Sequence, residues 1–201
     1  MSVFAAKGYE STSLADLEQA MGINRVSMYA TFGNKEALFV KAMTRYTEVG
    51  SHRFLHYLAA PSARQGFETL LRESVAMFTD PQGHGVCFVT QAPLTGANIS
   101  AQTKRFVAER RAGIELMLCR RLRQALDEGE LAPGTPIEDL ARFFATTILG
   151  LALQAQHGAT QSELLHVAEI AMRTWPPARR RLRKSNTTSA HAVTARIAAA
   201  R

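Results

Sequence analysis

The sequence has few of the residues that mark secreted, membrane-spanning or fibrous proteins. Its 201 residues include two cysteines, Cys87 and Cys119, too few for a disulfide framework, and this favours a reducing environment. The longest apolar run, residues 143–155, has 13 residues, whereas a transmembrane helix needs roughly 18. No stretch at the start has the residue order of a signal peptide. These absences exclude a membrane protein, a secreted scaffold and a collagen-like fibre, and they predict a cytoplasmic protein.

Acidic residues are absent from one end of the chain, and this absence explains the net charge of +7. Residues 176–201 contain six arginines, one lysine and no acid, whereas the rest of the chain contains seventeen bases and seventeen acids. The surplus therefore belongs to a tail without apolar periodicity, which we expect to be disordered. Its bases would attract phosphate non-specifically, or the tail is an extension without a role. Net charge alone does not predict nucleic-acid binding.

Apolar residues make up 46% of the chain, and they recur at helical spacing along nearly all of it, whereas strand alternation is almost absent. Cap and stop residues predict helices over 14–21, 25–32, 35–58, about 67–78, 100–128, 136–157 and 161–175. Thr135 is expected to cap the helix at 136, with Glu138 closing a capping box. Residues 87–91 fit a strand or helical turns, and the lack of a partner strand favours helix. The predicted fold class is all-α.

The two C-terminal helices are apolar around much of their circumference. Within residues 143–155 only Thr146, Thr147 and Gln154 are polar. A helix exposed to water on one side shows a clear polar face, and these do not. A packed interior of one chain would explain this composition. A homodimer explains it more simply, because each helix then packs against its own chain and against a second copy.

The two short helices near the start have the proportions of a DNA-binding helix-turn-helix, with residues 22–24 as the turn. Six residues supply a buried seam: Leu14, Leu17, Met21, Ile23, Met28 and Phe32. The outer side of the second helix carries residues able to read base edges and methyl groups: Arg25, Val26, Ser27, Ala30 and Thr31. Any helical hairpin with a glycine turn shares this pattern, so the exact residues of the segment are needed to identify a DNA-binding motif.

Three segments of the sequence are distinctive: Gly8-Tyr9-Glu10-Ser11-Thr12-Ser13-Leu14, Met21-Gly22-Ile23-Asn24-Arg25 and Tyr29-Ala30-Thr31-Phe32-Gly33-Asn34-Lys35-Glu36-Ala37-Leu38. They closely resemble the TetR family of bacterial regulators, and the match covers residues 4–40. The resemblance implies an all-α homodimer that binds a palindromic double-stranded operator and releases it when a small molecule enters the C-terminal domain. It divides the chain into a DNA-binding domain (1–47), a ligand-binding and dimerisation domain (48–175) and the basic tail (176–201).

The resemblance also implies roles for single residues. Thr12, Ser13, Tyr29 and Lys35 match positions that contact phosphate or backbone, and Arg25 matches a groove-facing position suited to reading guanine. Val26, Ser27, Ala30 and Thr31 complete the expected DNA-binding set. Tyr29 is otherwise a core aromatic residue, and Lys35 is otherwise an exposed lysine without a role.

The first helix departs from the family pattern. In the family it starts well before the Phe4–Gly8 stretch, whereas Met1 precedes Phe4 here by three residues. Only about two turns are therefore expected, with Leu17 and Met28 less covered. A misassigned start, a shortened chain or a degenerate regulator would each produce this pattern.

Polar residues of the C-terminal domain are weak candidates for effector contacts: Tyr57, Gln91, Thr146 and Gln154. The aromatic and methionine residues of this domain suit an apolar ligand, and equally a helical core. Cys87 matches a cysteine that senses electrophiles or oxidants in some family members, although an inert buried thiol is the commoner case. His52 and His56 have the spacing of two metal ligands, but such pairs arise by chance, so no metal and no cofactor is predicted.

Sequence motifs of catalysis are absent, and we do not expect an enzyme. The leading hypothesis is a ligand-responsive, homodimeric repressor. The alternatives are a helical ligand-binding dimer that no longer binds DNA, and a thiol- or metal-responsive form of the same repressor.

Overall fold

Helices account for all the regular secondary structure in the part of the chain that the computed structural model describes, residues 1–80 and 99–176. The predicted all-α fold is confirmed there. The helices are α1 (Ser2–Ser11), α2 (Leu14–Met21), α3 (Arg25–Phe32), α4 (Lys35–Leu58), α5 (Ala63–Phe78), α7 (Ala101–Asp127), α8 (Ile137–Gln156) and α9 (Gln161–Arg173). Gln91, Cys87 and residues 177–201 of the predicted tail lie outside the described residues.

Side-chain caps explain why most of these helices begin where they do. The N-cap side chain accepts a hydrogen bond from the backbone N–H three residues on at six helix starts: Ser13, Asn24, Asn34, Ser62, Ser100 and Thr160. The start of α8 differs from the prediction, because its N-cap is Pro136, whose ring has no hydrogen-bonding group and makes no capping bond. The Thr135 hydroxyl donates instead to Ala132 O, and Glu138 pairs with Arg123. The predicted capping box at Thr135 is therefore wrong.

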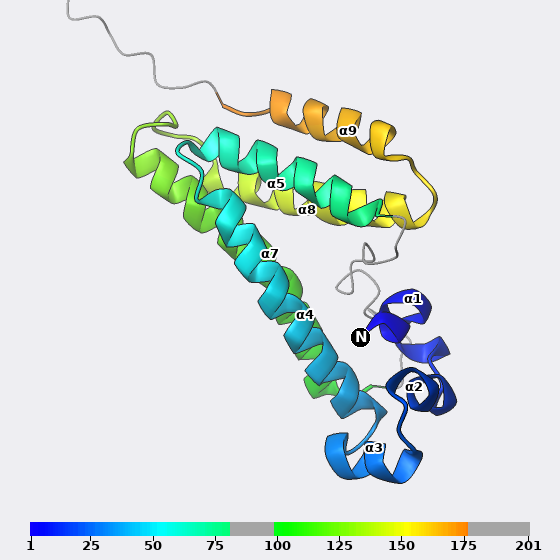
Figure 1. Cartoon of the computed structure of the whole chain (residues 1–201). Coiled ribbons are helices and arrows are strands. Elements are labelled where there is room, and N and C mark those ends of the chain that lie inside the picture. Colours follow the sequence, from blue (N-terminus) through cyan, green and yellow to red (C-terminus); the bar gives the residue numbers. More distant parts are fainter. Residues whose placement is uncertain (81–98, 177–201) are drawn as a thin grey trace, which may run out of the picture.

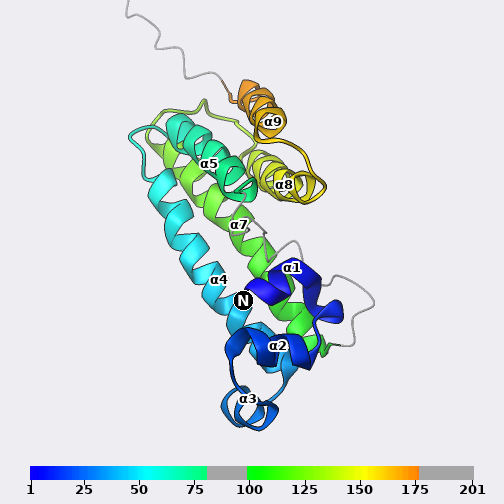
Figure 2. The same cartoon turned by 45° about the vertical axis from the view of Figure 1, so that its right-hand side comes forward.

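Two long helices, α4 and α7, run side by side and connect the two ends of the molecule (Figure 1). Helices α1, α2 and α3 gather around the start of α4, and α5, α8 and α9 pack at its far end (Figures 1 and 2). Phe67, Phe144 and Trp175 form the aromatic centre of the far end, with ring centroids 4.9–6.0 Å apart. Helices α4 and α7 thus both span the two parts, and α4 follows directly after α3 in the chain.

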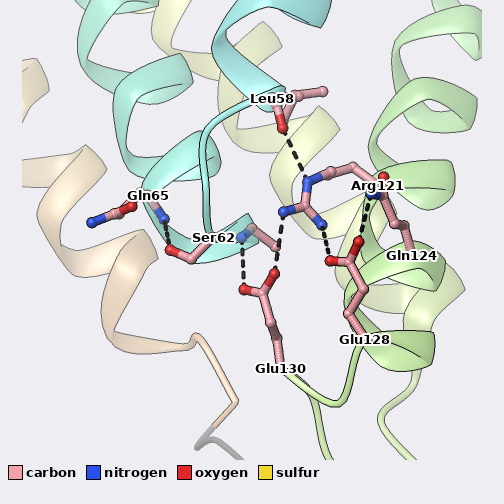
Figure 3. A network of polar contacts seen from close by, with 8 residues as sticks. Leu58, Ser62, Gln65, Arg121, Gln124, Glu128 and Glu130 are labelled. Atoms are coloured by element: carbon pink, nitrogen blue, oxygen red, sulfur yellow. Dashed lines mark hydrogen bonds and ion pairs between the residues drawn. The ribbon is translucent and has the colours of Figure 1, made fainter.

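A buried arginine on α7 closes the far end of the α4–α7 pair (Figure 3). Arg121 Nε donates to the carbonyl of Leu58 at 3.0 Å, and Nη2 contacts Glu130 Oε1 at 3.2 Å. The other Glu130 oxygen accepts from the N–H of Ala63 at 2.7 Å. Nη1 lies 3.7 Å from Glu128 Oε2. One guanidinium therefore ties together the end of α4, the start of α5 and the loop after α7.

Helices α8 and α9 leave apolar side chains exposed in the single chain. Phe143, Leu153, Val167 and Ile170 are 39%, 47%, 46% and 58% exposed. The opposite side of α8 is buried and includes Phe144. The structure therefore shows a core side and an uncovered apolar side on these two helices, which we call the α8–α9 face (Phe143, Leu153, Val167 and Ile170).

No helix within residues 1–80 and 99–176 combines the length and apolar character that crossing a bilayer requires.

Candidate nucleic-acid interface

The turn between α2 and α3 is held by local contacts that leave α3 projecting. Gly22 ends α2 with a φ of 65°, in the left-handed region that glycine adopts without strain. Asn24 Oδ1 then accepts from the N–H of Ser27 at 2.8 Å and starts α3. Gly33, with a φ of 87°, ends α3 and allows α4 to begin two residues later. This is the predicted helix-turn-helix, and its boundaries follow from glycine and asparagine.

Helix α2 begins with a reciprocal capping box. The N–H of Asp16 donates to Ser13 Oγ at 3.1 Å, and the N–H of Ser13 donates to Asp16 Oδ2 at 2.8 Å. The ammonium of Lys7 on α1 donates to Asp16 Oδ1 at 2.6 Å. These contacts, the Lys7 hydrogen bond first, lower the pKa of Asp16 from 3.8 to about 2. The box thus fixes the start of α2 and links it to α1.

The Asp16 carboxyl is expected to titrate near pH 2 in the folded protein. Because its pKa is lower in the folded than in the unfolded chain, its contribution to stability is complete above pH 4 and is lost as the pH falls from about 4 to about 2. Carboxyl-detected NMR titration measures the midpoint directly. Lys7→Met is expected to move the midpoint toward 3.8, and a wild-type midpoint of 3.8 would contradict the capping box.

The inner side of the helix-turn-helix is well covered. Leu17 and Met28 are only 3% and 2% exposed, so the expectation that a short first helix would leave them uncovered is wrong. The rings of Phe4 and Tyr9 from α1 both meet Phe39 of α4, at 5.4 and 5.0 Å. Gly8 makes this possible, because its φ of 75° bends α1 between its two aromatic residues. Ten residues of α1 therefore suffice to complete this small core.

The outer side of α3 is largely exposed, and its Arg25 Nε lies 3.4 Å from Glu18 Oε1 of α2. Val26 is 77% exposed and Tyr29 is 41% exposed, although both are large and apolar enough to pack inside. The same side carries four further exposed residues: Arg25, Ser27, Ala30 and Thr31. Tyr29 is therefore not a core aromatic residue. The groove-facing residues expected from the sequence lie on one accessible surface.

Two of the four residues expected to contact phosphate have other partners in the structure. Thr12 is 1% exposed, and its hydroxyl donates to Gly8 O at 2.6 Å, so the expected phosphate contact by this side chain is corrected. The Lys35 ammonium lies 4.5 Å from the centroid of the Tyr9 ring and donates to Glu10 O at 3.4 Å. Partial burial lowers the pKa of Lys35. Ser13 remains exposed at the start of α2.

The residues expected to contact an effector are not brought together. Thr146 and Gln154 are exposed on α8 and do not face the interior, because the buried side of that helix is filled by apolar residues. Tyr57 is half-buried at the end of α4, and Gln91 lies outside the described residues. Two hollows open between α4 and α7, of about 470 and 230 Å³, and neither includes these residues. His52 borders the smaller hollow.

Metal-ligand clusters of three or more His, Cys, Asp or Glu residues are absent from residues 1–80 and 99–176. His52 and His56 lie there without the third ligand that a site would need.

A contact that the sequence did not indicate joins the start of α4 to the start of α7. Glu36 Oε1 accepts from the N–H of Ser100 at 2.9 Å and from its hydroxyl at 2.6 Å. The hydrogen bond from the Ser100 hydroxyl, then one from the Thr103 side chain and last the bond from the Ser100 N–H, lower the pKa of Glu36. The partners are 64 residues apart, so no local spacing could have revealed them.

Comparisons with known proteins agree with this geometry. The model of the family described as bacterial regulatory proteins, tetR family, matches residues 1–42, which comprise α1 to α3 and the first turns of α4. The repressor ComR of Escherichia coli K12 is 30% identical over 178 residues, covering 88% of this chain and 85% of ComR. The uncharacterised regulator YezE of Bacillus subtilis 168 is 29% identical over 174 residues, covering 86% of this chain and 90% of YezE.

A solved structure shares the fold over most of the chain. It is the TetR family regulator CifR, as a cysteine mutant in complex with 26-base-pair operator DNA. It superposes with a TM-score of 0.82 and 40% sequence identity, covering 87% of this chain and 92% of CifR. Together with the ComR match, which extends far beyond the helix-turn-helix, this similarity settles the family. The chain belongs to the TetR family of bacterial transcriptional regulators.

Proposed function

We propose that this protein is a homodimeric transcriptional repressor that binds a palindromic operator through α2 and α3 and is released by a small-molecule inducer. The observation that carries the proposal is the outer side of α3. It is a short helix packed through the buried Met28, with exposed outer side chains, of which Arg25 pairs with Glu18 of α2 at 3.4 Å. An eight-residue helix is about 12 Å long, and the major groove of B-DNA is about 12 Å wide.

Each exposed residue of α3 suits a definite part of the DNA. The guanidinium of Arg25 is the group that reads guanine through two acceptor atoms, and the Val26 side chain suits a thymine methyl group. Ser27, Ala30 and Thr31 complete the groove-facing set. Ser13, Tyr29 and Lys35 are proposed to contact phosphate, which positions the helix without reading sequence. The similar regulator CifR was solved with operator DNA, which supports this mode of binding.

Two-fold symmetry would follow from the α8–α9 face. We propose that this face packs against the same face of a second copy, because exposed apolar side chains on two adjacent helices form a self-complementary surface. A dimer presents two recognition helices, which must lie about 34 Å apart to enter successive major grooves. The operator is therefore proposed to be a palindrome.

The effector is proposed to act through α4. We assign residues 1–47 to DNA binding, 48–175 to effector binding and dimerisation, and the cytoplasm as the location. Because α4 belongs to both parts, a small molecule that moves it changes the spacing of the two recognition helices. A change of a few ångströms from the roughly 34 Å repeat is enough to lose one groove.

Replacing Arg25 by alanine tests the groove contact. The variant is expected to bind the DNA upstream of its own gene about 5- to 150-fold more weakly than wild type, equivalent to about 1–3 kcal/mol. Affinity for a scrambled fragment is expected to change much less, because that binding depends on phosphate. Fluorescence anisotropy at low and moderate salt measures both.

The matched control is Arg64→Ala, which removes the same charge from an exposed residue of α5 at the far end of the molecule. It is expected to leave both affinities unchanged. If the wild type binds the native and scrambled fragments equally, the repressor proposal fails and a ligand-binding dimer without operator recognition is favoured.

A further inference from the structure

We propose that Glu36 and Ser100 form a positioning pair that fixes the angle of α4 against α7, and through it the position of the recognition helix α3. The pair is a device for transmitting motion between the effector-binding part and the DNA-binding part. This inference rests on the proposed function, since it names residues through which an effector would act.

The contact is well defined because it uses both hydrogen-bonding sides of the Ser100 hydroxyl. The hydroxyl donates to Glu36 Oε1 at 2.6 Å and accepts from the N–H of Thr103 at 3.1 Å as the cap of α7. The N–H of Ser100 adds a second bond to the same carboxylate oxygen at 2.9 Å. Two bonds to a charged acceptor are stronger than neutral ones, and the positive end of the α7 dipole adds to them.

The recognition helix follows the start of α4 closely. Only Gly33 and Asn34 separate α3 from α4, and the N–H of Gly33 donates to Tyr29 O at 2.9 Å. Asn34 then caps α4, with Oδ1 accepting from the N–H of Ala37 at 2.7 Å. Glu36 lies in the first turn after this link. A displacement of the first turn of α4 is therefore passed on to α3.

Apolar packing leaves part of the space between the first turns of α4 and α7 unfilled. A hollow of about 470 Å³ opens between the first turns of α4 and α7, and both Glu36 and Ser100 line it. At the other end of the helix pair, Arg121 holds the carbonyl of Leu58. Helix α4 is thus tied to α7 by polar contacts near both ends, and releasing Glu36 leaves it hinged at Leu58.

The length of α4 makes a small rotation important. Its 24 residues span about 36 Å, so a rotation of about 5° at Leu58 moves its first turn by about 3 Å. Groove spacing tolerates little more than this. One contact at the start of α4 is therefore well placed to decide whether two recognition helices fit an operator.

The test compares Glu36→Ala with Glu36→Gln in the full-length chain. Both changes remove a negative charge, but the glutamine carbonyl still accepts the two bonds from Ser100, whereas alanine accepts neither. Spin labels at Gln19→Cys on α2 and Asp127→Cys at the end of α7, both exposed, report the angle of α4 by electron–electron resonance. The background carries Cys87→Ser and Cys119→Ala, and excess unlabelled protein ensures that distances within one chain are read.

The wild type and Glu36→Gln are expected to give one narrow distance distribution, and Glu36→Ala a broader one. Operator affinity is expected to be at least about fivefold lower for Glu36→Ala than for Glu36→Gln. The alanine variant samples many angles of α4, and DNA binding must select the few that fit the operator. Glu48→Ala, an exposed carboxylate further along α4, is the control. Equal distributions for the alanine and glutamine variants would overturn the inference.

The distance measurement needs neither DNA nor a dimer, so its result is independent of the proposed function. A wild type that fails to prefer its upstream DNA would refute the proposed function while the distances still decide the role of Glu36. If Glu36→Ala does not fold, Ser100→Ala replaces it, because it removes the 2.6 Å bond and keeps the amide bond. Its control is Ser62→Ala, which loses an equivalent cap on α5.

Discussion

Replacing Arg121 by methionine is expected to lower the free energy of unfolding by about 3 kcal/mol. Methionine fills a similar volume but leaves the carbonyl of Leu58 and the carboxylate of Glu130 without the guanidinium between them. Arg121 is only 8% exposed, so water cannot readily take its place. Urea unfolding followed by circular dichroism measures the loss, which should appear as a lower midpoint.

Arg120→Met is the control for this change, because Arg120 is the neighbouring arginine on α7 and is exposed. It is expected to change the free energy of unfolding by less than about 0.5 kcal/mol. Adding Glu130→Gln to Arg121→Met should recover part of the loss, since it removes the carboxylate left without its partner. Equal effects of the Arg120 and Arg121 changes would show that the buried network does not stabilise the fold.

Changing Ile170 to glutamate is expected to raise the dissociation constant of the proposed dimer about 100-fold or more. Ile170 is 58% exposed on the α8–α9 face, and burying an unpaired carboxylate there costs several kcal/mol. Two-fold symmetry places that charge in the interface twice. Analytical ultracentrifugation measures the dissociation constant, and operator affinity should fall in parallel because only one half-site is then held.

Val49→Glu is the matched control for the dimer. Val49 is 44% exposed on α4, so the change introduces the same charge at an exposed apolar residue away from α8 and α9. It is expected to leave the dissociation constant unchanged. Circular dichroism should show full helicity for both variants, since neither residue is in the core. A wild type that sediments as a monomer at micromolar concentration would contradict the proposed dimer.

The sequence predicts most of the fold because the helix boundaries depend on local chemistry. Ser13, Asn24 and Asn34 cap helices through bonds to backbone groups three residues away, and Gly33 ends α3 with a left-handed φ. Such signals are complete within a few residues of sequence. The predicted cap of α8 was wrong because Thr135 lies one residue too far from the start of the helix. Its hydroxyl donates instead to Ala132 O in the preceding turn.

The candidate site was predictable on α3 and much less so elsewhere. The outer residues of α3 follow from helical periodicity, since Met28 and Phe32 must face inward. Thr12 was misplaced because only the tertiary arrangement reveals that its side chain is buried, where its hydroxyl donates to Gly8 O four residues earlier. Thr146 and Gln154 were misplaced because the sequence of a helix that is apolar around most of its circumference does not show which side faces the interior. Glu36–Ser100 and Arg121–Leu58 join distant segments, so no periodicity announces them.

The exposed outer side of α3 has a consequence for the evolution of this regulator. Val26, Ser27, Ala30 and Thr31 are exposed, and α3 is held in place by Met28 and its caps. Exposed positions of this kind tolerate substitution within about 0.5 kcal/mol. Selection is therefore free to alter them without first restoring stability elsewhere. On the proposed function, a duplicated gene would acquire a new set of target promoters through a handful of substitutions that leave the stability of the fold unchanged.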